Sequence, residues 1–594
     1  MSYRRKKLLA LFFAMALSMT AVAGCTGTKS STGNVVSSET ETNAEETSAQ
    51  SEAGTFSSAD MFTERDLAGT YEESGAVYVT LSDDGIAGET DGVVIDGQMV
   101  TITAEGTYIF SGTLSEGQIV VDADNAKVQI VFDNVDITCA SSAAVYVKSA
   151  EKVFVTLAEG SQNTLRNTDE YVAIDDNNID AVIFAKSDLT LNGTGSLTII
   201  SAEGHGIVSK DDLKIIGGTY DITAAGHALS GKDSVRIADG TFILTAEKDG
   251  IHAENADDEE KGYIYIADGD FTITSDGDGM DASNIVQIED GTLDITAGGG
   301  SANSLKTHES DVPGGPGGGM PQNGEKLDGE SMPQMGEKPD GENMPQDTTT
   351  DESGTSTKGI KAGGGMYLNG GTYQIDSADD SIHSNANITI ADGTYTLATG
   401  DDGVHADDAL IVNGGTITVT ESYEGLEGLA VTINDGTIDI TASDDGINTA
   451  GEKMELNGGY IHILAGGDGV DSNGDLTING GEIYIDGPSD NGNSAIDYGD
   501  RSSAYVNGGT LVAIGSSGMA EVMSDSSKQK VLMVKLGEQM EAGNVVLTDS
   551  EGNVIVSYTA LKTYDCVIIS TAEVESGATY TLTTSGTTTE VTAE

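Results

Sequence analysis

Residues 399–420 read TGDDGVHADDALIVNGGTITVT, and residues 377–398, directly before them, read SADDSIHSNANITIADGTYTLA. Each segment has a doubled aspartate, then a histidine, then short apolar runs separated by Asn-Gly-Gly or Asp-Gly. Related segments recur along much of the 594-residue chain. A motif that recurs at a fixed period indicates a structural repeat, so the fold has to be established before any chemistry is assigned.

The period is measured from the second residue of each GG or DG pair that opens a strand. Most of these glycines follow one another at 21 to 23 residues, with one gap of 80 and two gaps of 28 and 29. Nonapeptide calcium repeats have a much shorter period, and propeller blades have a period about twice as long. The glycines stand at positions 195, 218, 240, 269, 291, 371, 393, 415, 436, 459, 481 and 509.

Apolar residues hold fixed places around each of these glycines, in pairs two residues apart. That spacing places both members of a pair on the same face of a strand. Three short strands in 22 residues cannot bury such a face alone, whereas stacked coils enclose a continuous core. The sequence therefore predicts an all-β parallel β-helix with about 22 residues and three strands per coil. The aromatic residues Tyr220, Phe242, Tyr373 and Tyr395 lie on the same strand face as the neighbouring isoleucines and leucines, so we expect them inside the coils.

The N-terminal segment predicts export and lipid attachment. Residues 1–24 have the basic and apolar regions of a signal peptide, and the apolar run is too short to span a bilayer. This segment ends in Val22-Ala23-Gly24-Cys25, which looks like a bacterial lipobox and implies lipidation of Cys25 on the cell surface. Ordinary secretory cleavage is the alternative. Residues 25–60, rich in Ser, Thr and Glu, read as a disordered tether.

Composition divides the rest of the chain. Residues 61–190 have looser strand periodicity, as expected of an N-terminal cap and first coils, and residues 191–520 hold the regular coils. Within them, residues 307–357 form an insertion rich in Gly, Pro and Met that we expect to leave the solenoid as a flexible loop. Residues 521–594 lose the period and predict a small C-terminal β domain. Cys139 and Cys566 form no metal-spaced set and read as buried thiols.

The net charge of −69 argues against nucleic acid or anionic lipid as a partner and favours divalent cations. Acidic residues and a few histidines and lysines recur in two columns. The first column, thirteen residues before the reference glycine once small insertions are allowed, contains His205, His227, Asp249, Asp278, Lys358, Asp380, Asp402, Glu424, Asp445 and Asp468. The second column, three residues further on, contains Asp281, Lys361, His383, His405, Glu427, Asn448 and Asp471.

Stacked coils bring neighbouring members of a column to roughly 4.8 Å. Two carboxylates at that separation repel by about 3.5 kcal/mol in a medium of effective dielectric near 20. Bound Ca²⁺, which prefers oxygen ligands and tolerates irregular geometry, would remove this repulsion. A transition metal held by His383 and His405 and an ion-free ladder of Asp-Gly turns are the alternatives. The predicted calcium ligands are Asp278, Asp281, Asp379, Asp380, Asp401, Asp402, Asp444, Asp445, Asp468 and Asp471.

The ordered motifs FTERDLAGTY (62–71), DAVIFAKSDLTLNGTGSL (180–197), GHGIVSKDDLKIIGGT (204–219) and GGTLVAIGSSGMAE (508–521) carry a resemblance. The sequence resembles the bacterial carbohydrate-binding domain proteins, which have a right-handed parallel β-helix of the pectate-lyase type without known lyase activity. The resemblance spans about residues 61–594. It implies binding of plant-type polysaccharide, cellulose or pectic polymers, together with bound calcium.

Two other functions remain open on the sequence alone. One is a calcium-dependent pectate lyase, for which Lys358 and Lys361 are the best-placed candidates as the base. The fragment Glu203-Gly204-His205-Gly206 also resembles part of a polygalacturonase motif, but the other elements of that motif are missing. The second alternative is a structural or adhesive protein of the cell envelope. We expect a binding protein without catalytic residues, and the sequence does not identify its sugar-contacting surface.

Overall fold

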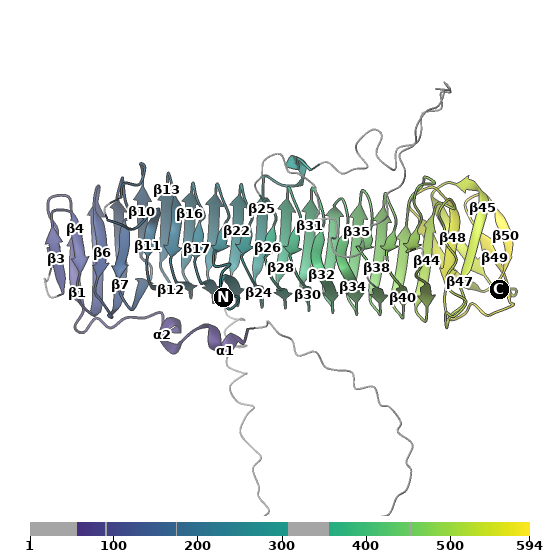
Figure 1. Ribbon diagram of the computed structural model, residues 1–594, viewed down its shortest axis with the longest axis horizontal. Coiled ribbons are helices and arrows are strands. Elements are labelled where there is room, and N and C mark those ends of the chain that lie inside the picture. The colour runs from purple at the N-terminus through teal and green to yellow at the C-terminus, as the bar shows by residue number, and fades with distance from the viewer. Residues whose placement is uncertain are drawn as a thin grey trace, which may run out of the picture. The chain divides into compact units, whose positions relative to one another are not determined.

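The computed structural model describes residues 56–88, 92–173, 175–306, 356–451, 453–499 and 501–593. The predicted signal peptide, the lipidation site at Cys25 and nearly all of the predicted loop at 307–357 lie outside these residues. Successive strands stack coil after coil along a solenoid (Figure 1). In most of the regular coils a strand pairs in parallel with the strand three further along the chain, as β13 with β16 and β16 with β19. The fold is therefore the parallel β-helix that the 22-residue repeat predicts.

Sheet 1 begins at the reference glycines, and its strands show strict alternation of exposed and buried residues. Its strands are β10 (Gln162–Asn167), β13 (Ser196–Ser201), β16 (Thr219–Ala224), β19 (Thr241–Ala246), β22 (Asp270–Ser275), β25 (Thr292–Ala297), β28 (Thr372–Ser377), β31 (Thr394–Thr399), β33 (Thr416–Glu421), β35 (Thr437–Ala442), β38 (Tyr460–Ala465), β41 (Glu482–Asp486) and β44 (Thr510–Gly515).

Sheet 2 follows the acidic turn, and most of its strands from β20 onward are three residues long with the middle residue facing outward. Its strands are β4 (Met99–Ile102), β6 (Gln118–Asp122), β8 (Val145–Ser149), β11 (Ala181–Ala185), β14 (His205–Ser209), β17 (Leu229–Gly231), β20 (Ile251–Ala253), β23 (Met280–Ala282), β26 (Ile360–Ala362), β29 (Ile382–Ser384), β36 (Ile447–Thr449), β39 (Val470–Ser472) and β42 (Ile496–Tyr498).

Sheet 3 completes each coil. Its strands are β9 (Lys152–Leu157), β12 (Asp188–Gly193), β15 (Asp212–Ile215), β18 (Ser234–Ile237), β21 (Tyr263–Ile266), β24 (Val286–Ile288), β27 (Met366–Leu368), β30 (Ile388–Ile390), β37 (Met454–Leu456), β40 (Leu476–Ile478) and β43 (Ala504–Val506). Two longer strands, β32 (Val404–Val412) and β34 (Leu426–Ile433), belong to both sheet 2 and sheet 3.

The solenoid is closed by different strands at its two ends. At the first coils, β1 (Val77–Leu81), β5 (Gly106–Leu114) and β7 (Lys127–Thr138) pair in parallel, and β2 (Ala87–Gly88) and β3 (Val93–Asp96) add antiparallel edges. At the last coil, β48 (Tyr564–Ser570) pairs antiparallel with β44 and with β45 (Leu532–Met540). A four-stranded antiparallel sheet then contains β46 (Gly543–Thr548), β47 (Val554–Ala560), β49 (Thr579–Thr583) and β50 (Thr588–Thr592).

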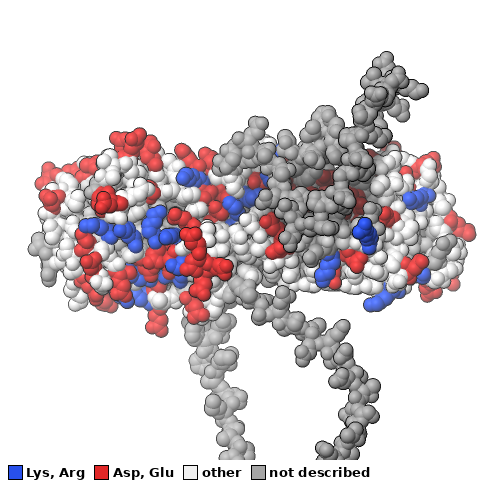
Figure 2. Space-filling view, in the orientation of Figure 1, with Lys and Arg blue, Asp and Glu red and all other residues white. Residues whose placement is uncertain are grey.

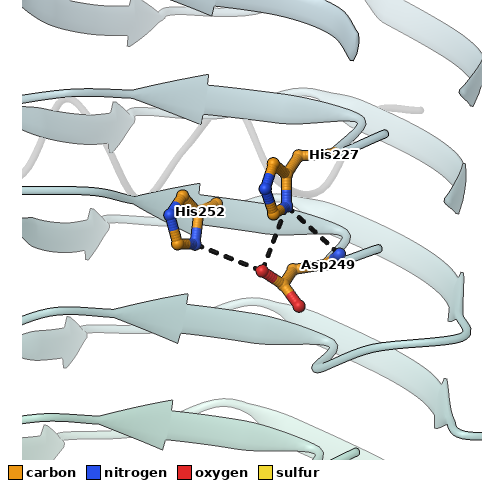
Figure 3. A group of neighbouring side chains, drawn as sticks. All are labelled: His227, Asp249 and His252. Atoms are coloured by element: carbon orange, nitrogen blue, oxygen red, sulfur yellow. Dashed lines mark hydrogen bonds and ion pairs between the residues drawn. The ribbon is translucent and has the colours of Figure 1, made fainter. Parts of the chain in front are cut away.

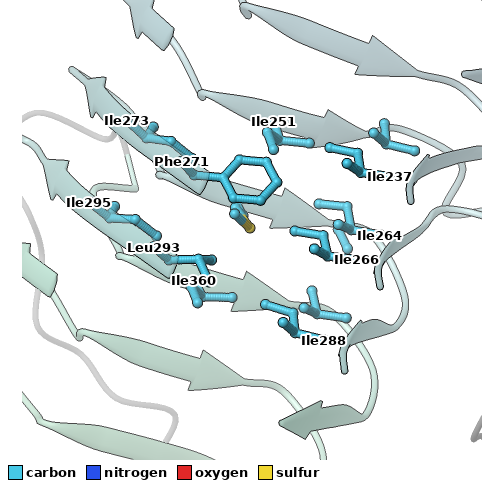
Figure 4. Packing of buried hydrophobic residues seen from close by; sticks show 14 of the residues in the cluster. Ile237, Ile251, Ile264, Ile266, Phe271, Ile273, Ile288, Leu293, Ile295 and Ile360 are labelled. Atoms are coloured by element: carbon cyan, nitrogen blue, oxygen red, sulfur yellow. The ribbon is translucent and has the colours of Figure 1, made fainter. Parts of the chain in front are cut away.

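The core repeats from coil to coil, as the apolar periodicity predicts. Figure 4 shows Ile273 above Ile295 and Phe271 above Leu293, with isoleucines of sheets 2 and 3 facing them. The predicted aromatic column is inside: Tyr220, Phe242, Tyr373 and Tyr395 are all fully buried, and neighbouring rings are stacked. Cys139 and Cys566 are buried thiols, as expected.

Residues 56–67, which we call the N-terminal strap, run across the outside of sheet 3. They contain α1 (Ser58–Met61) and α2 (Glu64–Leu67), both drawn below the solenoid in Figure 1. Phe56 exchanges backbone hydrogen bonds with the Gln287 amide on β24, and the buried Asp66 bonds Lys152 on β9. The predicted disordered tether therefore ends before residue 60, because Phe56 and Met61 bury apolar surface against Tyr263 and Tyr265. None of the helices among the described residues is long and apolar enough to cross a membrane.

Candidate functional site

The two columns predicted from the sequence lie side by side along sheet 2. The second column occupies the outward middle position of its strands, with Asp281, Lys361, His383 and His405 in register on successive coils. The register continues through Glu427, Asn448 and Asp471. The first column lies in the turn before each of these strands. We call the two columns together the charged ladder.

Side chains of the first column have a structural role that sequence reasoning missed. Most of its histidine and aspartate members accept a hydrogen bond from the backbone N–H of the next member of the column, one coil further along, whereas Lys358 has no acceptor atom. Asp278 Oδ1 accepts from Lys358 N at 2.7 Å, and Asp402 Oδ1 accepts from Glu424 N at 3.1 Å. His205 Nδ1 accepts from His227 N at 2.8 Å in the same way. An acceptor at this position satisfies a turn amide that no strand ladder reaches.

The ladder begins with histidines. His205, His227 and His252 stack with ring centroids 4.8 and 4.3 Å apart. Figure 3 shows His227 and His252 side by side, both directed toward Asp249, whose Oδ2 lies 3.0 and 3.2 Å from their Nδ1 atoms. Burial lowers the pKa of His205 to about 3. Its Nδ1 accepts a hydrogen bond from the backbone N–H of His227 in the next coil. His252 is not among the predicted members of the columns, because the insertion that follows it lengthens its distance from the reference glycine Gly269.

Lysines neutralise the middle of the ladder. Lys358 Nζ lies 2.9 Å from Asp379 Oδ1 and 2.6 Å from Asp380 Oδ2. Lys306, from the turn after β25, pairs with the same Asp379 at 2.7 Å and with Asp401. Burial opposes ionisation of Asp380, but Lys358 and the neighbouring histidine outweigh it and hold its pKa well below the usual value.

Six predicted calcium ligands in this middle section therefore have ammonium or imidazole partners: Asp278, Asp281, Asp379, Asp380, Asp401 and Asp402. Lys361 Nζ lies 3.4 Å from both Asp278 and Asp281, which makes the middle of the ladder a lysine–aspartate network. His405 Nδ1 lies 3.1 Å from Asp402 and 3.1 Å from Glu427. No sequence signal pointed to Lys306, because it lies beside the insertion and outside the repeat.

Acids dominate the last section of the ladder. Asp445, Asp468 and Asp471 bring carboxylate oxygens within 4.8 Å of one another. Burial, followed by the charges of neighbouring aspartates, raises the pKa of Asp445 to about 8 and that of Asp468 to about 7. Burial, followed by the negative charges of Asp497 and Asp444, raises the pKa of Asp471 to about 6. We call these three residues, with Asp444 and Asp497, the acid end.

The acid end fits a hard divalent cation. Its donors are carboxylate oxygens, which Ca²⁺ prefers, and they come from three successive coils. The strongest charges acting on Asp445, Asp468 and Asp471 are all negative, so the cluster lacks the ammonium groups that neutralise Asp379 and Asp380. Among the predicted calcium ligands, Asp444, Asp445, Asp468 and Asp471 are the set that the structure brings together without a cationic side chain.

Elsewhere the surface carries mixed charge. Figure 2 shows one face, on which acidic side chains cover much of the coils nearest the N-terminus with lysines and arginines between them. Arg236 faces outward from β18. It is covered, however, because its guanidinium bonds Asp212 at 2.9 Å and the Met61 carbonyl of the N-terminal strap at 3.3 Å.

The fold and the charged ladder define a parallel β-helix protein with one edge lined by acidic residues, lysines and histidines. A family model described as carbohydrate-binding domain-containing protein matches residues 96–403 and 401–552. The chain belongs to this family.

Two known proteins resemble parts of the chain. A carbohydrate-binding domain-containing protein of Acetivibrio thermocellus is 40% identical over 139 residues, which are 23% of this chain and 49% of the relative. The chain thus spans about half the length of this curated relative. A solved polysaccharide lyase-like protein from C. thermocellum, a gadolinium derivative, is 36% identical and covers 38% of this chain and 92% of its own, with a TM-score of 0.37.

Proposed function

We propose that this protein is a lipoprotein of the cell surface that binds plant-type polysaccharide, cellulose or pectic polymers, without cleaving it. Family membership supports the carbohydrate partner. The single observation that carries the calcium part of the proposal is the acid end, where Asp445, Asp468 and Asp471 lie together without a cationic partner. An anionic chain of net charge −69 can hold an anionic uronan only through bridging cations.

Ca²⁺ at the acid end would offset the repulsion among the aspartate carboxylates and could at the same time bind a uronate carboxylate. The ligands would be Asp444, Asp445, Asp468 and Asp471, with Asp497 beside them. Calcium accepts six to eight oxygen ligands, so four protein carboxylates leave positions for a sugar carboxylate or water. Lipid attachment at Cys25 would hold this surface outside the cell.

The lyase alternative is disfavoured by the state of its candidate bases. A lyase base must be unprotonated when it removes the proton beside the uronate carboxyl. Burial opposes the charge on Lys358, but Asp380 and Asp379 outweigh it and raise the pKa of Lys358 above its ordinary value. For Lys361, burial is likewise outweighed by Asp278 and Asp281, and its pKa is raised. Both lysines therefore stay protonated, and each is paired with carboxylates.

One experiment separates binding, cleavage and a purely structural role. The protein lacking its signal peptide is incubated with pectate or cellulose, in calcium or in chelator, and both sugar retention and unsaturated-uronate absorbance are measured. We expect pectate retention in calcium, loss of retention in chelator, and no rise in absorbance. Rising absorbance that Lys358→Ala abolishes would establish a lyase, and no retention on any glycan would favour a structural role.

A matched pair of variants tests the acid end. The double variant Asp468→Asn, Asp471→Asn keeps the Asp468 acceptor for Ser494 N but removes two negative charges. We expect it to lose calcium-dependent retention of pectate. The control, Asp221→Asn with Asp270→Asn, removes the same charge from exposed positions of sheet 1 and should bind like the wild type. Equal loss in both variants would assign the effect to overall charge.

A further inference from the structure

An exposed tyrosine interrupts the outward column at the start of sheet 1. The residues paired in this column are Ser196, Thr219, Thr241, Asp270, Thr292, Thr372, Thr394, Thr416, Thr437, Tyr460, Glu482 and Thr510. Tyr460 is the one aromatic residue among them, and 42% of its surface is exposed. Threonine is suited to this solvent-facing strand position, so the coil does not need an aromatic ring there.

Tyr460 lies on an open groove of about 630 Å³ that crosses four coils. The floor of the groove is made by the turns of Gly459, Gly481 and Gly509, whose φ angles of 82°, 86° and 83° are in the left-handed region. A Cβ on Gly481 would lie 2.8 Å from the carbonyl oxygen of Gly459, so side chains are excluded from the floor. The groove is lined by Asp435, Gly436, Thr437, Gly459, Tyr460, Gly481, Glu482, Gly509 and Thr510.

A row of asparagine amides borders this floor in the same turns. The residues are Asn413, Asn434, Asn457, Asn479 and Asn507, and each later Nδ2 donates to the preceding Oδ1 at 2.8 to 2.9 Å. An asparagine amide nitrogen carries two hydrogens, so the row uses one and leaves the second for a ligand or water. The row therefore presents one polar group per coil along the groove.

Two further tyrosines extend the aromatic surface. The rings of Tyr460 and Tyr484 have centroids 5.7 Å apart, and Tyr484 stacks on Tyr558 of β47 at 5.2 Å. Tyr558 donates its hydroxyl hydrogen to Asp486, which holds the C-terminal sheet against β41. His462, in register with Tyr484, lies 2.9 Å from Asp439. The C-terminal sheet thus fixes one side of the aromatic cluster in place.

These features match the chemistry of a neutral sugar chain. A pyranose ring has apolar C–H faces that pack on aromatic rings and hydroxyls around its edge that exchange hydrogen bonds with amides and carboxylates. Successive coils repeat at roughly 4.8 Å, comparable with one sugar residue in an extended glycan. The acidic rim formed by Asp435 and Glu482 repels a uronate, which makes this groove different in charge preference from the acid end.

We propose that the surface formed by Tyr460, Tyr484, Glu482 and the asparagine row binds an extended neutral glycan of the cellulose type, without calcium. The proposal rests on the carbohydrate-binding function proposed above and adds a second, independent subsite to it. Sheet 1 connects the two, because β38 begins at Tyr460 in the groove and ends three residues before Asp468 in the acid end.

The test measures binding of soluble cello-oligosaccharides and hydroxyethyl cellulose by calorimetry and affinity electrophoresis, with chelator present. We expect Tyr460→Ala to weaken binding at least tenfold and Tyr460→Phe to keep most of the affinity, since the ring supplies the contact. Tyr78→Ala is the matched control, because Tyr78 is 48% exposed on β1 at the other end of the solenoid. Circular dichroism melting verifies that all three variants are folded.

The outcomes distinguish this groove from the proposed function as a whole. Wild-type affinity in Tyr460→Ala overturns the groove assignment. Pectate binding in calcium without any binding of neutral glycan overturns the groove and leaves the proposed function standing. Failure of the wild type to bind any glycan overturns both.

Discussion

Asp445 Oδ1 accepts a hydrogen bond of 2.6 Å from the backbone N–H of Asp468 in the next coil. This carboxylate therefore has two roles at once: it satisfies a turn amide, and it is the first member of the acid end. The amide needs only an oxygen acceptor, whereas a cation needs the negative charge. The two roles can be separated by substitution.

Asp445→Asn and Asp445→Ala should differ in stability but not in calcium response. The asparagine keeps an acceptor for Asp468 N, whereas alanine leaves this amide unsatisfied at a penalty of about 1–3 kcal/mol. We expect the alanine variant to melt below the asparagine variant in chelator, and the calcium-induced rise in melting temperature to shrink in both. Equal midpoints of the two variants would show that water replaces the acceptor.

Calcium should raise the melting temperature of the wild type, because a ligand that binds only the folded state stabilises it by mass action. The rise should occur at micromolar to millimolar calcium and reverse on adding chelator. The double variant Asp468→Asn, Asp471→Asn should respond several-fold less. A melting midpoint that does not change with calcium would support an ion-free acidic ladder. A larger rise with zinc than with calcium would support a transition metal held by His383 and His405.

Lys358→Ala should destabilise the middle of the solenoid strongly. The variant leaves Asp379 and Asp380 without one of their ammonium partners in a buried setting, and removal of one member of a buried ion pair costs about 3–5 kcal/mol. The control is Lys453→Ala, whose side chain is 58% exposed and pairs with Glu455, and it should change stability by less than about 1 kcal/mol. Thermal melting of both variants measures the difference, and equal shifts would contradict this account.

The N-terminal strap should loosen in acid through Asp66. Burial opposes its charge, but Lys152, Thr63 and Thr190 outweigh it and lower the pKa of Asp66 to about 2. A depressed carboxyl pKa contributes stability that is present above the unfolded value near 4 and is lost as the pH falls toward 2. The difference in melting temperature between wild type and Asp66→Asn should therefore be largest above pH 5 and vanish near pH 2.

Hydrogen exchange of residues 56–67 provides the second readout for this pH effect. Protection of these amides should fall in Asp66→Asn at neutral pH, while that of the β16 and β19 amides stays unchanged. Loss of protection throughout the solenoid would mean that Asp66 stabilises the coils directly and not through the strap.

The solenoid was predictable because each coil repeats the same spacing of apolar residues that must be buried and of glycines in the turns. Tyr220 and Phe242 had to share a face with the isoleucines around them, and the two charged columns had to align once the period was known. The function of their members was less predictable, because it depends on residues outside the period. Lys306 reaches Asp379 from the edge of an insertion, and its position could not be derived from any repeat.

The groove at Tyr460 could also be predicted only in part from the sequence. Tyr460 stands one residue after its glycine, while the buried aromatics stand two after theirs, so parity alone indicates that Tyr460 faces outward. The alternation of residues along the strand could not show that Tyr558, almost a hundred residues later, belongs to the same aromatic cluster. That contact depends on how the C-terminal sheet packs on β41.

The N-terminal strap has a mechanical consequence. The chain reaches the solenoid at Phe56, beside β21 and β24, and only then runs back to the first coil at β1. A pulling force applied before residue 56 is therefore first resisted by the Phe56–Gln287 bonds and then by the buried Asp66–Lys152 pair. The strap must therefore detach in that order before the force reaches β1, so these contacts break before the coils are loaded.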